Sequence, residues 1–500
     1  MKRIFLSSLI CCVFFQLLGQ DQTENIFLKR TFWKNMPSVE LVKAKIAEGH
    51  DPTENDAFGF DAVSYGIIDE APIETIKYLL TLEGNPVTKP THGDVTYLLW
   101  SAYKGNVALA QHLLDLGSDI HFATTRGTNI LLITAIGGVE DQAMYDLIFD
   151  NGVAVDYENA SGANVLLSLA GSDATDQTLF QYLIDKGLSW DHQDEYGNGL
   201  FHYAARAGNM PIMKMCLDKG IDYELINTKG ENALLYASYG RKRSEVLLET
   251  FSFLDSLGLE VDVVNWEGKT PLHNAISKAN PEIIDFFITR GVNVNQIDEK
   301  GNTAFMNSVW GKVDNIKKIR SHVEDINQTN HEGHSALAIA VMGAREDAFT
   351  YLIAQGADPH ILDKDGNDLL SLAFQNFSER REEQFQNIIT ALTEQGLPLK
   401  PAYHEGNTLA HYAVEKNNPY LLEKAIELGV DLNHQNEIGI TSLHLAAMKA
   451  KDNAMINMML AAGANKNIRT KFMESSYELA SENELLIKNQ VDIDMLKLSE

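Results

Sequence analysis

The chain has 500 residues, more than one compact core usually holds, so several domains or a repeat array are expected. Hydrophobic residues make up 45% of it, with 35 Gly and 12 Pro, and this composition excludes extended disorder. The formal charge of −28 repels phosphate backbones and makes nucleic acid a poor partner, but it does not specify what does bind.

The first 19 residues have the features of an export signal. Lys2 and Arg3 precede an apolar run from Ile4 to Leu18, and Gly19 offers a small residue for cleavage. The run is short for a membrane-spanning helix, and no later segment is long and apolar enough for one. We therefore expect a cleaved signal peptide and an exported chain, periplasmic or secreted, that does not insert into a membrane. A retained anchor is the alternative.

Residues 20–55 are interpreted as an N-terminal cap followed by a degenerate repeat. The stretch PSVELVKAKIAEGHDP, residues 37–52, indicates a second helix and the turn after it. The preceding NIFLKRTFWKN, residues 25–35, would supply the first helix and cover the open end of an array.

A glycine-led pattern dominates the chain from residue 56 to residue 468. Segments of the same kind, a turn followed by two helical stretches, return every 32 to 40 residues, which predicts a repeat array. The leading glycines are Gly59, Gly93, Gly127, Gly162, Gly197, Gly230, Gly268, Gly301, Gly333, Gly366, Gly406 and Gly439.

Four copies carry the clearest signature. They read GNGLFHYAARAGN from Gly197, GKTPLHNAISKAN from Gly268, GNTLAHYAVEKNN from Gly406 and GITSLHLAAMKAK from Gly439. The period and the TPLH-x-A signature resemble the ankyrin repeat family, over about twelve repeats and roughly residues 24 to 468. The resemblance implies an all-α ankyrin-repeat solenoid: helix-turn-helix units with short hairpin-like turns, stacked into a right-curving open array.

The repeat that begins at Gly268 shows how the residues build one unit. A turn of Asx, two residues and Gly comes first, since Gly permits a positive φ. Thr270 then suits a helix N-cap and Pro271 the first helical position. A second helix is expected over residues 281–290, and its apolar face would carry Ile283, Ile284, Phe287 and Ile288.

The signature histidines are interpreted as structural. Catalysis needs one histidine with a dedicated partner, whereas His202, His273, His411 and His444 occupy equivalent slots in four repeats. The family resemblance implies that this side chain hydrogen-bonds backbone across the turn between units. No catalytic residue is therefore expected.

Two repeats are longer than the others, near residues 227–264 and 363–403. Their surplus falls around GRKRSEVLLETFSFLDSLG and NFSERREEQFQNIITALTEQG, near the junction of the two helices. Arg241, Lys242 and Arg243 in the first of them form a compact basic cluster in an acidic chain. A solvated loop and a contact to an acidic partner both account for that cluster.

Residues 469–500 are expected to form a C-terminal cap. The segment IRTKFMESSYELASENELLIKNQ, which begins at Ile468, resembles a last repeat whose outer face has become polar. Terminal units of a stack must shield its open end, so an atypical last unit is expected.

Candidate binding residues follow from repeat position. The resemblance implies that an ankyrin array binds through its turn tips and the exposed edge of its first helices, and hot spots favour aromatic residues and Arg. The partner-binding candidates are Tyr103, Tyr196, Arg206, Tyr239, Trp266, Lys269, Lys300, Trp310, His331, His334, Lys364 and His404. Packing of some of these rings against the next unit is the alternative.

The leading hypothesis is a non-enzymatic, monomeric scaffold that binds a protein partner through its concave groove and turn tips. The sequence has no phosphate-binding P-loop, no GxSxG and no HExxH motif. His331 and His334 lie on an expected turn tip with no obvious third ligand, so no metal and no cofactor are expected. The alternatives are a hydrolase or metal-dependent enzyme with its site in a lengthened repeat, and a secreted host-directed interaction factor.

Overall fold

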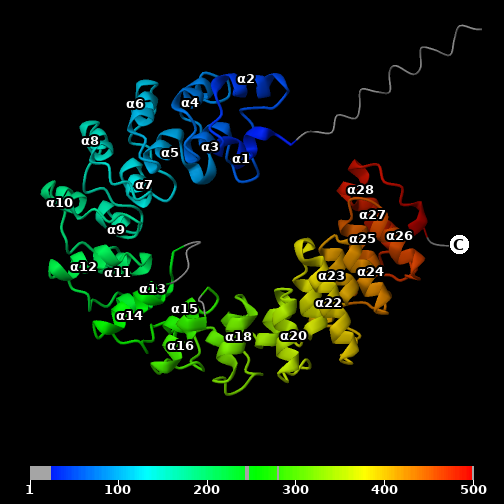
Figure 1. Cartoon of the computed structure of the whole chain (residues 1–500). Coiled ribbons are helices and arrows are strands. Elements are labelled where there is room, and N and C mark those ends of the chain that lie inside the picture. Colours follow the sequence, from blue (N-terminus) through cyan, green and yellow to red (C-terminus); the bar gives the residue numbers. More distant parts are fainter. Residues whose placement is uncertain (1–23, 242–246, 279–280, 498–500) are drawn as a thin grey trace, which may run out of the picture. The chain divides into compact units, whose positions relative to one another are not determined.

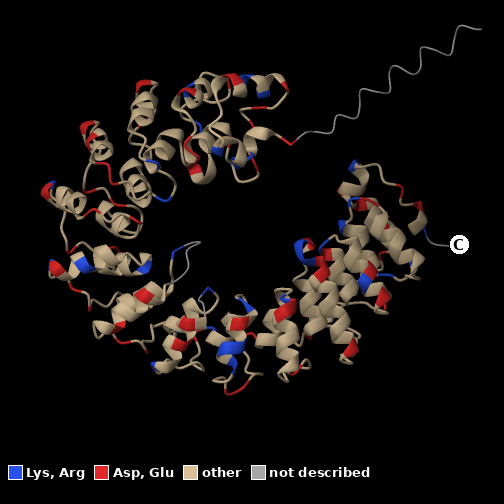
Figure 2. Ribbon diagram, viewed as in Figure 1, with Lys and Arg blue, Asp and Glu red and all other residues tan. Residues whose placement is uncertain are grey.

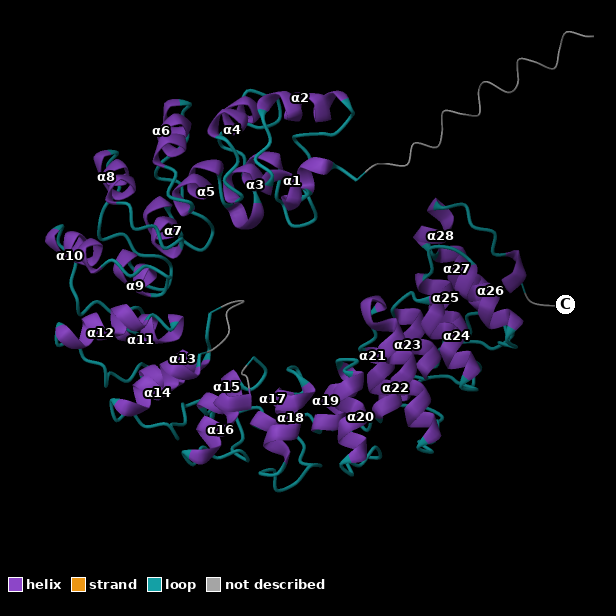
Figure 3. Cartoon of the chain, in the orientation of Figure 1, coloured by secondary structure: helices purple, strands orange, loops and turns teal. Residues whose placement is uncertain are grey.

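The computed structural model describes residues 24–241, 247–278 and 281–497. These residues form helices and turns (Figure 3), and their extended pairing is limited to three isolated antiparallel bridges, which join Ile297 to Thr303, Thr329 to Ser335 and Arg469 to Ser475. The expected all-α class is confirmed. The predicted signal peptide, together with Lys242 and Arg243, lies outside the described residues.

The chain divides into two compact units, Met1–Thr228 and Lys229–Glu500, which we call unit 1 and unit 2 (Figure 1). Each unit is a series of helix pairs, in which a first helix is followed by a second helix. The described part of unit 1 begins with a short 3-10 turn, η1 (Ile26–Leu28), and the pair α1 (Arg30–Lys34) and α2 (Val39–Ala47). Its further pairs are α3 (Ala62–Ile68) and α4 (Ile73–Leu80), α5 (Tyr97–Tyr103) and α6 (Val107–Asp115), α7 (Ile130–Ile136) and α8 (Gln142–Asp150), α9 (Val165–Ala170) and α10 (Gln177–Asp185), and α11 (Leu200–Ala207) and α12 (Met210–Asp218).

Unit 2 continues the same pattern. Its pairs are α13 (Ala233–Ser238) and α14 (Leu248–Ser256), α15 (Pro271–Ala275) and α16 (Pro281–Thr289), α17 (Ala304–Ser308) and α18 (Val313–Arg320), α19 (Ala336–Met342) and α20 (Glu346–Ala354), α21 (Leu369–Gln375) and α22 (Glu382–Glu394), α23 (Leu409–Glu415) and α24 (Pro419–Glu427), α25 (Ser442–Lys449) and α26 (Ala454–Ala461), and α27 (Ser476–Glu482) and α28 (Glu484–Lys488). Four 3-10 turns complete the described elements: η2 (His92–Asp94) in unit 1, and η3 (Glu379–Arg381), η4 (His404–Gly406) and η5 (Asp494–Leu496) in unit 2.

Packing between neighbouring pairs forms the core of each unit. First helices pack on first helices, as α5 does on α7, and second helices pack on second helices, as α16 does on α18. In unit 2 one first-helix slot is small and buried in every repeat from 229 to 446, which lets neighbouring helices approach closely. Its occupants are Ala237, Ala275, Ser308, Ala340, Ala373, Ala413 and Ala446.

The repeat that begins at Gly268 starts its helices as the sequence predicts. Pro271 is the first residue of α15 after an extended Thr270, and Pro281 is the first of α16. The apolar face of α16 differs in one place, because Phe286 is buried and Ile288 only partly so. Phe286 turns inward because it packs edge-on against Phe287 and lies 6.1 Å from the ring of Phe251 in α14.

The second lengthened repeat places its surplus between its two helices. The extra residues form η3 and extend α22 to 13 residues, whereas the other second helices of unit 2 before the terminal α28 have eight or nine. In the first lengthened repeat the surplus includes residues 242–246, which the structure does not describe.

Candidate functional site

We call the turn before a first helix a finger, and the fingers at Asn265, Asp298, Asn330 and Asp363 share the same internal bonding. In the finger from Asp298 to Gly301, Asp298 Oδ1 accepts the N–H groups of Lys300 at 2.9 Å and Asn302 at 2.8 Å. Gly301 has φ = 79°, and a Cβ there would lie 2.8 Å from the backbone nitrogen of His331 in the next finger. The Asx and Gly of the repeat therefore build a finger that stacks closely on its neighbour.

Backbone hydrogen bonds join consecutive fingers of unit 2 at their tips. Four such bonds link five fingers: Trp266 N to Lys229 O at 3.0 Å, Glu299 N to Glu267 O at 2.8 Å, His331 N to Lys300 O at 2.9 Å, and Lys364 N to Glu332 O at 3.0 Å. At the second lengthened repeat the pattern changes, because His404 N donates to the Asn367 side chain at 3.5 Å. The five fingers from Lys229 to Lys364 therefore form one continuous, backbone-linked row.

Three signature histidines tie each first helix to the next repeat. His273 Nδ1 accepts the Thr270 N–H at 3.1 Å, so its ring proton lies on Nε2, which donates to the Asn302 carbonyl at 3.2 Å. His411 and His444 make the same bonds, to Thr408 and Ile440 and to Thr441 and Ile468. Both ring nitrogens are thus engaged by backbone, as the family resemblance implied.

Burial keeps these histidines neutral. Desolvation lowers the pKa of His411 to about 4, against the opposing effect of its bond to the Ile440 carbonyl. It also lowers the pKa of His273 and of His444. His202 in unit 1 is buried in the same slot, but Gly199 stands where the other three copies have Thr, so its helix start lacks a cap side chain.

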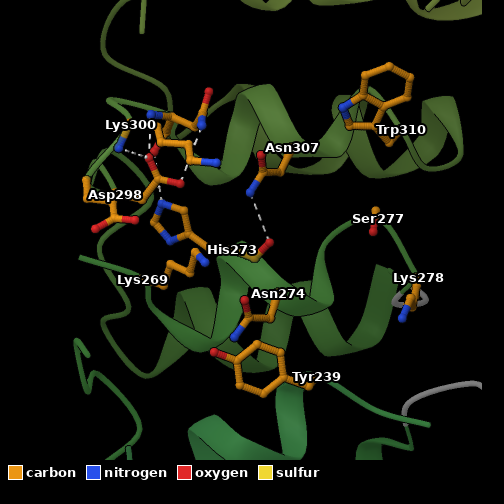
Figure 4. A pocket seen from close by; sticks show the side chains of 12 residues that line it. Tyr239, Lys269, His273, Asn274, Ser277, Lys278, Asp298, Lys300, Asn307 and Trp310 are labelled. Carbon is orange, nitrogen blue, oxygen red and sulfur yellow. Dashed lines mark hydrogen bonds between the residues drawn. The ribbon is translucent and has the colours of Figure 1, made fainter. Parts of the chain in front are cut away.

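A hollow of about 380 Å³ opens between the finger tips and the first helices of unit 2 (Figure 4), and we call it the Trp310 hollow. Residues of the fingers at Lys269 and Lys300 form one end, and Trp310 with Ser277 lies toward the other. Its full lining is Tyr239, Lys269, His273, Asn274, Ser277, Lys278, Asp298, Glu299, Lys300, Asn302, Asn307 and Trp310.

Four of the twelve candidate residues meet in this hollow, namely Tyr239, Lys269, Lys300 and Trp310. The others lie apart from its lining. Tyr103, Tyr196 and Arg206 belong to unit 1, and Trp266 is exposed at a neighbouring tip. His331, His334 and Lys364 occupy the next two fingers, and His404 follows the second lengthened repeat.

Trp310 is the apolar element of the hollow. Its side chain is 52% exposed, and it lies over Gly343, where a Cβ would meet the indole at 2.8 Å. Gly343 therefore permits the close approach that holds the ring in place. An exposed, positioned indole offers a large contact area at low entropic cost.

Tyr239 combines a wall of the hollow with a structural role. Its hydroxyl donates to Glu231 Oε1 at 2.6 Å, and Asn265 Nδ2 donates to the same oxygen at 2.9 Å. Burial, followed by the bond to Glu231, raises the pKa of the Tyr239 hydroxyl well above its usual value. Glu231 is itself buried, so removal of the hydroxyl would leave a buried carboxylate with one partner fewer.

Sequence reasoning missed the amides along the hollow. Asn274 donates to Ser238 Oγ at 3.1 Å, and Asn307 donates to the His273 carbonyl at 3.1 Å. The two asparagines stand in the same slot of consecutive repeats, one residue after His273 and Met306. A comparison of that slot across the copies would have pointed to these two asparagines.

The second lengthened repeat contributes to another hollow, of about 690 Å³, in unit 2. It is lined by Ala344, Arg345, Glu346, Asp347, Thr350, Arg380, Arg381 and Gln384. Two of its guanidiniums are fixed by backbone, since Arg345 donates to Gly311 O at 2.5 Å and Arg381 donates to Gly343 O. Three arginines and two carboxylates thus share a polar surface.

A metal site and a membrane-spanning helix are two features other than partner binding that bear on function. Among the described residues, no group of three or more His, Cys, Asp or Glu is placed to hold a metal ion. The same part of the chain has no helix with the length and apolarity that a bilayer crossing requires.

Models of the ankyrin repeat family match both units. A model of three ankyrin repeats matches residues 167–254 and 245–330, and a model of many ankyrin repeats matches residues 410–460. With the helix pairs, the fingers and the histidine ties, these matches show that the chain contains ankyrin repeats. Ankyrin repeats are a protein-interaction module, and their architecture is generally non-enzymatic.

Individual relatives match part of this chain. A transient receptor potential cation channel subfamily A member 1 homolog of Caenorhabditis elegans is 37% identical over 112 residues, which are 22% of this chain and 9% of that protein. Phosphocholine transferase AnkX of Legionella pneumophila is 26% identical over 234 residues, 44% of this chain and 25% of that protein. The chain thus spans a quarter or less of either relative. Human ASB11 ankyrin repeat domain, a solved structure, aligns with 46% of this chain and 98% of its own at 19% identity and a TM-score of 0.33.

Proposed function

We propose that this protein is a non-enzymatic scaffold that binds a partner protein at the Trp310 hollow and the finger tips around it. The observation that carries the proposal is the convergence of Tyr239, Lys269, Lys300 and Trp310 on one hollow beside a backbone-linked row of fingers. A surface fixed in this way loses little conformational entropy when a partner binds. We further propose that the chain acts as a monomer, and that nucleic acid and membrane lipid are not its partners.

An export destination, periplasmic or secreted, belongs to the same proposal. It is supported by the charged and apolar pattern of residues 1–19 alone. Fractionation of cells into envelope and medium, followed by N-terminal sequencing of the mature chain, tests it. Recovery of the chain with Lys2 and Arg3 still attached would contradict a cleaved signal.

Site-specific photo-crosslinking tests the binding surface. A photoreactive residue at Ser277, inside the hollow, is expected to give one dominant protein adduct in the native envelope fraction. The matched control carries the same group at Lys317, an exposed position of α18. Because Trp310 is half exposed, Trp310→Ala is expected to remove the Ser277 adduct while leaving the urea midpoint nearly unchanged.

Two results would contradict the proposed surface. One is an adduct at Lys317 with none at Ser277, which would place the partner on the second helices. The other is a Ser277 adduct that Trp310→Ala leaves intact, since the indole would then contribute nothing to recognition.

If the protein were instead an enzyme, the arginine-lined hollow beside the second lengthened repeat would be a candidate for its active site. Turnover by the purified chain that Arg380→Ala abolishes, with folding unchanged, would favour it over the scaffold. The corresponding loop of the first lengthened repeat lies outside the described residues, so the structure adds nothing on it.

A further inference from the structure

The Trp310 hollow carries positive charge within a strongly acidic chain. Its lining contains three ammonium groups, on Lys269, Lys278 and Lys300, and two carboxylates, on Asp298 and Glu299. Figure 2 shows acidic residues along the second helices of unit 2. The chain as a whole also has a negative formal charge, of −28. The sign of the local charge at the hollow is therefore opposite to that of the chain.

Most carboxylates near the hollow are already engaged. Asp298 is buried and accepts the N–H groups of its own finger. Glu267 lies 2.6 Å from Lys269 Nζ and 3.5 Å from Lys229 Nζ, and the bond to Lys269 lowers its pKa. Among the lining residues, Glu299 is thus the exposed carboxylate that remains available to oppose the lysines.

Lys278 and Lys300 are free to bind an external carboxylate. Both are exposed, and neither ammonium group has an ion-pair partner among the described residues. They stand at different ends of the hollow, because Lys300 belongs to a finger tip and Lys278 follows α15 beside Trp310 (Figure 4). A ligand with one acidic group would satisfy only one of them.

The floor between the two lysines suits a peptide backbone. The amide of Asn274 and that of Asn307 each use one N–H on the preceding repeat, and this bond fixes their orientation. Asn307 retains an Oδ1 acceptor and a second N–H, the donor and acceptor pair that a peptide unit presents, whereas Asn274 also hydrogen-bonds Tyr239 and retains its Oδ1 acceptor. The two amides lie in consecutive repeats, as extended recognition requires.

We infer that the Trp310 hollow binds an extended acidic segment of the partner protein, an inference that rests on the proposed function. One carboxylate of the segment pairs with Lys300, and a second pairs with Lys278. An apolar side chain packs on the Trp310 indole, and the backbone between them bonds to Asn274 and Asn307. A basic or neutral segment would leave both ammonium groups unpaired beneath it.

Short synthetic peptides test this inference on the full chain. The probes are three sets of capped, fluorescein-labelled nonapeptides, randomised over Glu, Tyr and Ser in the first set, with Gln or Lys in place of Glu in the others. Since the whole chain repels acidic peptides, retention of the Glu set reports a local site. We expect that set to be retained at low salt, and anisotropy titration to show affinity falling as salt rises.

Matched substitutions assign the retained peptides to the hollow. Lys278→Gln and Lys300→Gln are each expected to weaken binding about threefold, and the double variant about tenfold. The control is Lys416→Gln with Lys451→Gln, two exposed lysines elsewhere in unit 2, which should change nothing. Glu299→Gln removes the opposing carboxylate and is expected to tighten binding about twofold.

The outcomes separate this inference from the proposed function. Retention of the Lys or Gln set that Trp310→Ala abolishes would overturn the acidic partner and leave the binding surface in place. Failure of all three sets, while the Ser277 crosslink still forms, would overturn it as well. If the control lysines had the same effect as Lys278 and Lys300, retention of the Glu set would reflect general charge attraction. That result would also overturn the inference.

Discussion

Units 1 and 2 solve the same problem, the joining of one finger to the next, with different side chains. In unit 2, a buried histidine of the earlier repeat reaches forward to a carbonyl of the following finger, as His411 does to Ile440. In unit 1 the later repeat reaches back, as Lys400 also does to Gly366 O at 3.0 Å in unit 2. His92 bonds to Phe58 O at 2.8 Å, Tyr157 to Gly127 O at 3.2 Å, and His192 to Gly162 O at 2.8 Å.

The acceptors differ as well, because His411 binds a carbonyl of the later finger and His192 binds one of the earlier finger, so a side-chain tie between repeats can come from either side. A buried carbonyl without a partner costs the free energy of its desolvation, so a donor from either repeat stabilises the interface. The signature histidine is one solution, and its absence from most of unit 1 does not mean that the joint is missing.

Low pH is expected to produce the largest difference in stability between the two units. In unit 2, burial lowers the pKa of His411 from 6.5 to about 4 and lowers those of His273 and His444 as well. The unfolded chain then binds more protons than the folded chain, so stability is full above about pH 6.5 and falls as pH drops toward 4. His411 alone accounts for about 3 kcal/mol at pH 4. Hydrogen exchange followed by mass spectrometry at pH 7 and pH 4.5 should show unit 2 losing protection first; earlier loss in unit 1 would contradict this.

Truncation of the two kinds of donor at neutral pH should differ in size. His411→Ala removes a fully buried ring with bonds to Thr408 and Ile440, and we expect a loss of about 3 kcal/mol in unfolding free energy. His92 is exposed, so His92→Ala should cost about 1 kcal/mol. Urea unfolding followed by exchange in each unit measures both, and equal costs would refute the distinction between buried and exposed ties.

Replacement of Asp by Asn at equivalent helix N-caps should lower the stability of unit 1 and raise that of unit 2. Asp61 in unit 1 is buried, 2.8 Å from Lys89 Nζ and 2.5 Å from the Tyr97 hydroxyl, so Asp61→Asn should cost about 3 kcal/mol. Asp368 in unit 2 is buried, its Oδ2 has no hydrogen-bond partner among the described residues, and burial raises its pKa. Asp368→Asn keeps the capping oxygen and removes a poorly solvated charge, so it should stabilise by about 1 kcal/mol.

Thermal and urea unfolding at pH 7 measure this pair of variants. The gain from Asp368→Asn should disappear at low pH, since a carboxyl whose folded pKa is raised costs nothing in charge burial once both states are protonated. A destabilised Asp368→Asn at pH 7 would mean that nearby Lys400 and Tyr403, which oppose the effect of burial, stabilise the Asp368 charge more than its burial costs.

The smallest expected effects concern the finger tips. His192→Ala removes a side-chain tie of unit 1 and should cost about 1 kcal/mol. Lys300→Ala in unit 2 leaves the backbone bond from His331 in place and should change stability by less than about 0.5 kcal/mol. Urea midpoints test both, and a large loss for Lys300→Ala would show that its side chain helps to hold the row together.

The repeat architecture could be predicted from the sequence because its signals are local. Gly268, Thr270 and Pro271 specify a turn and a helix start through their own backbone preferences, and the structure places both there. The location of Trp310 and Lys300 on one binding surface could also be anticipated, since repeat slots convert to places on a solenoid.

What the sequence did not reveal depends on neighbours. The bond of Tyr239 to buried Glu231 and the inward turn of Phe286 follow from packing between repeats. The surplus residues of the second lengthened repeat became η3 and a longer α22, an outcome that residue counts alone do not decide. The ties made by His92, Tyr157 and His192 share no sequence slot with the signature histidine.

The tip-to-tip bonds of the row from Lys229 to Lys364 use main-chain atoms of Trp266, Glu299, His331 and Lys364, whose side chains take no part in them. Along this edge, main-chain atoms hold the fingers together, and the side chains are left to contact a ligand. Exchange of Lys278 and Lys300 for glutamate should redirect the same frame toward cationic ligands without any adjustment of its skeleton, which makes the row a natural starting point for retargeting by design.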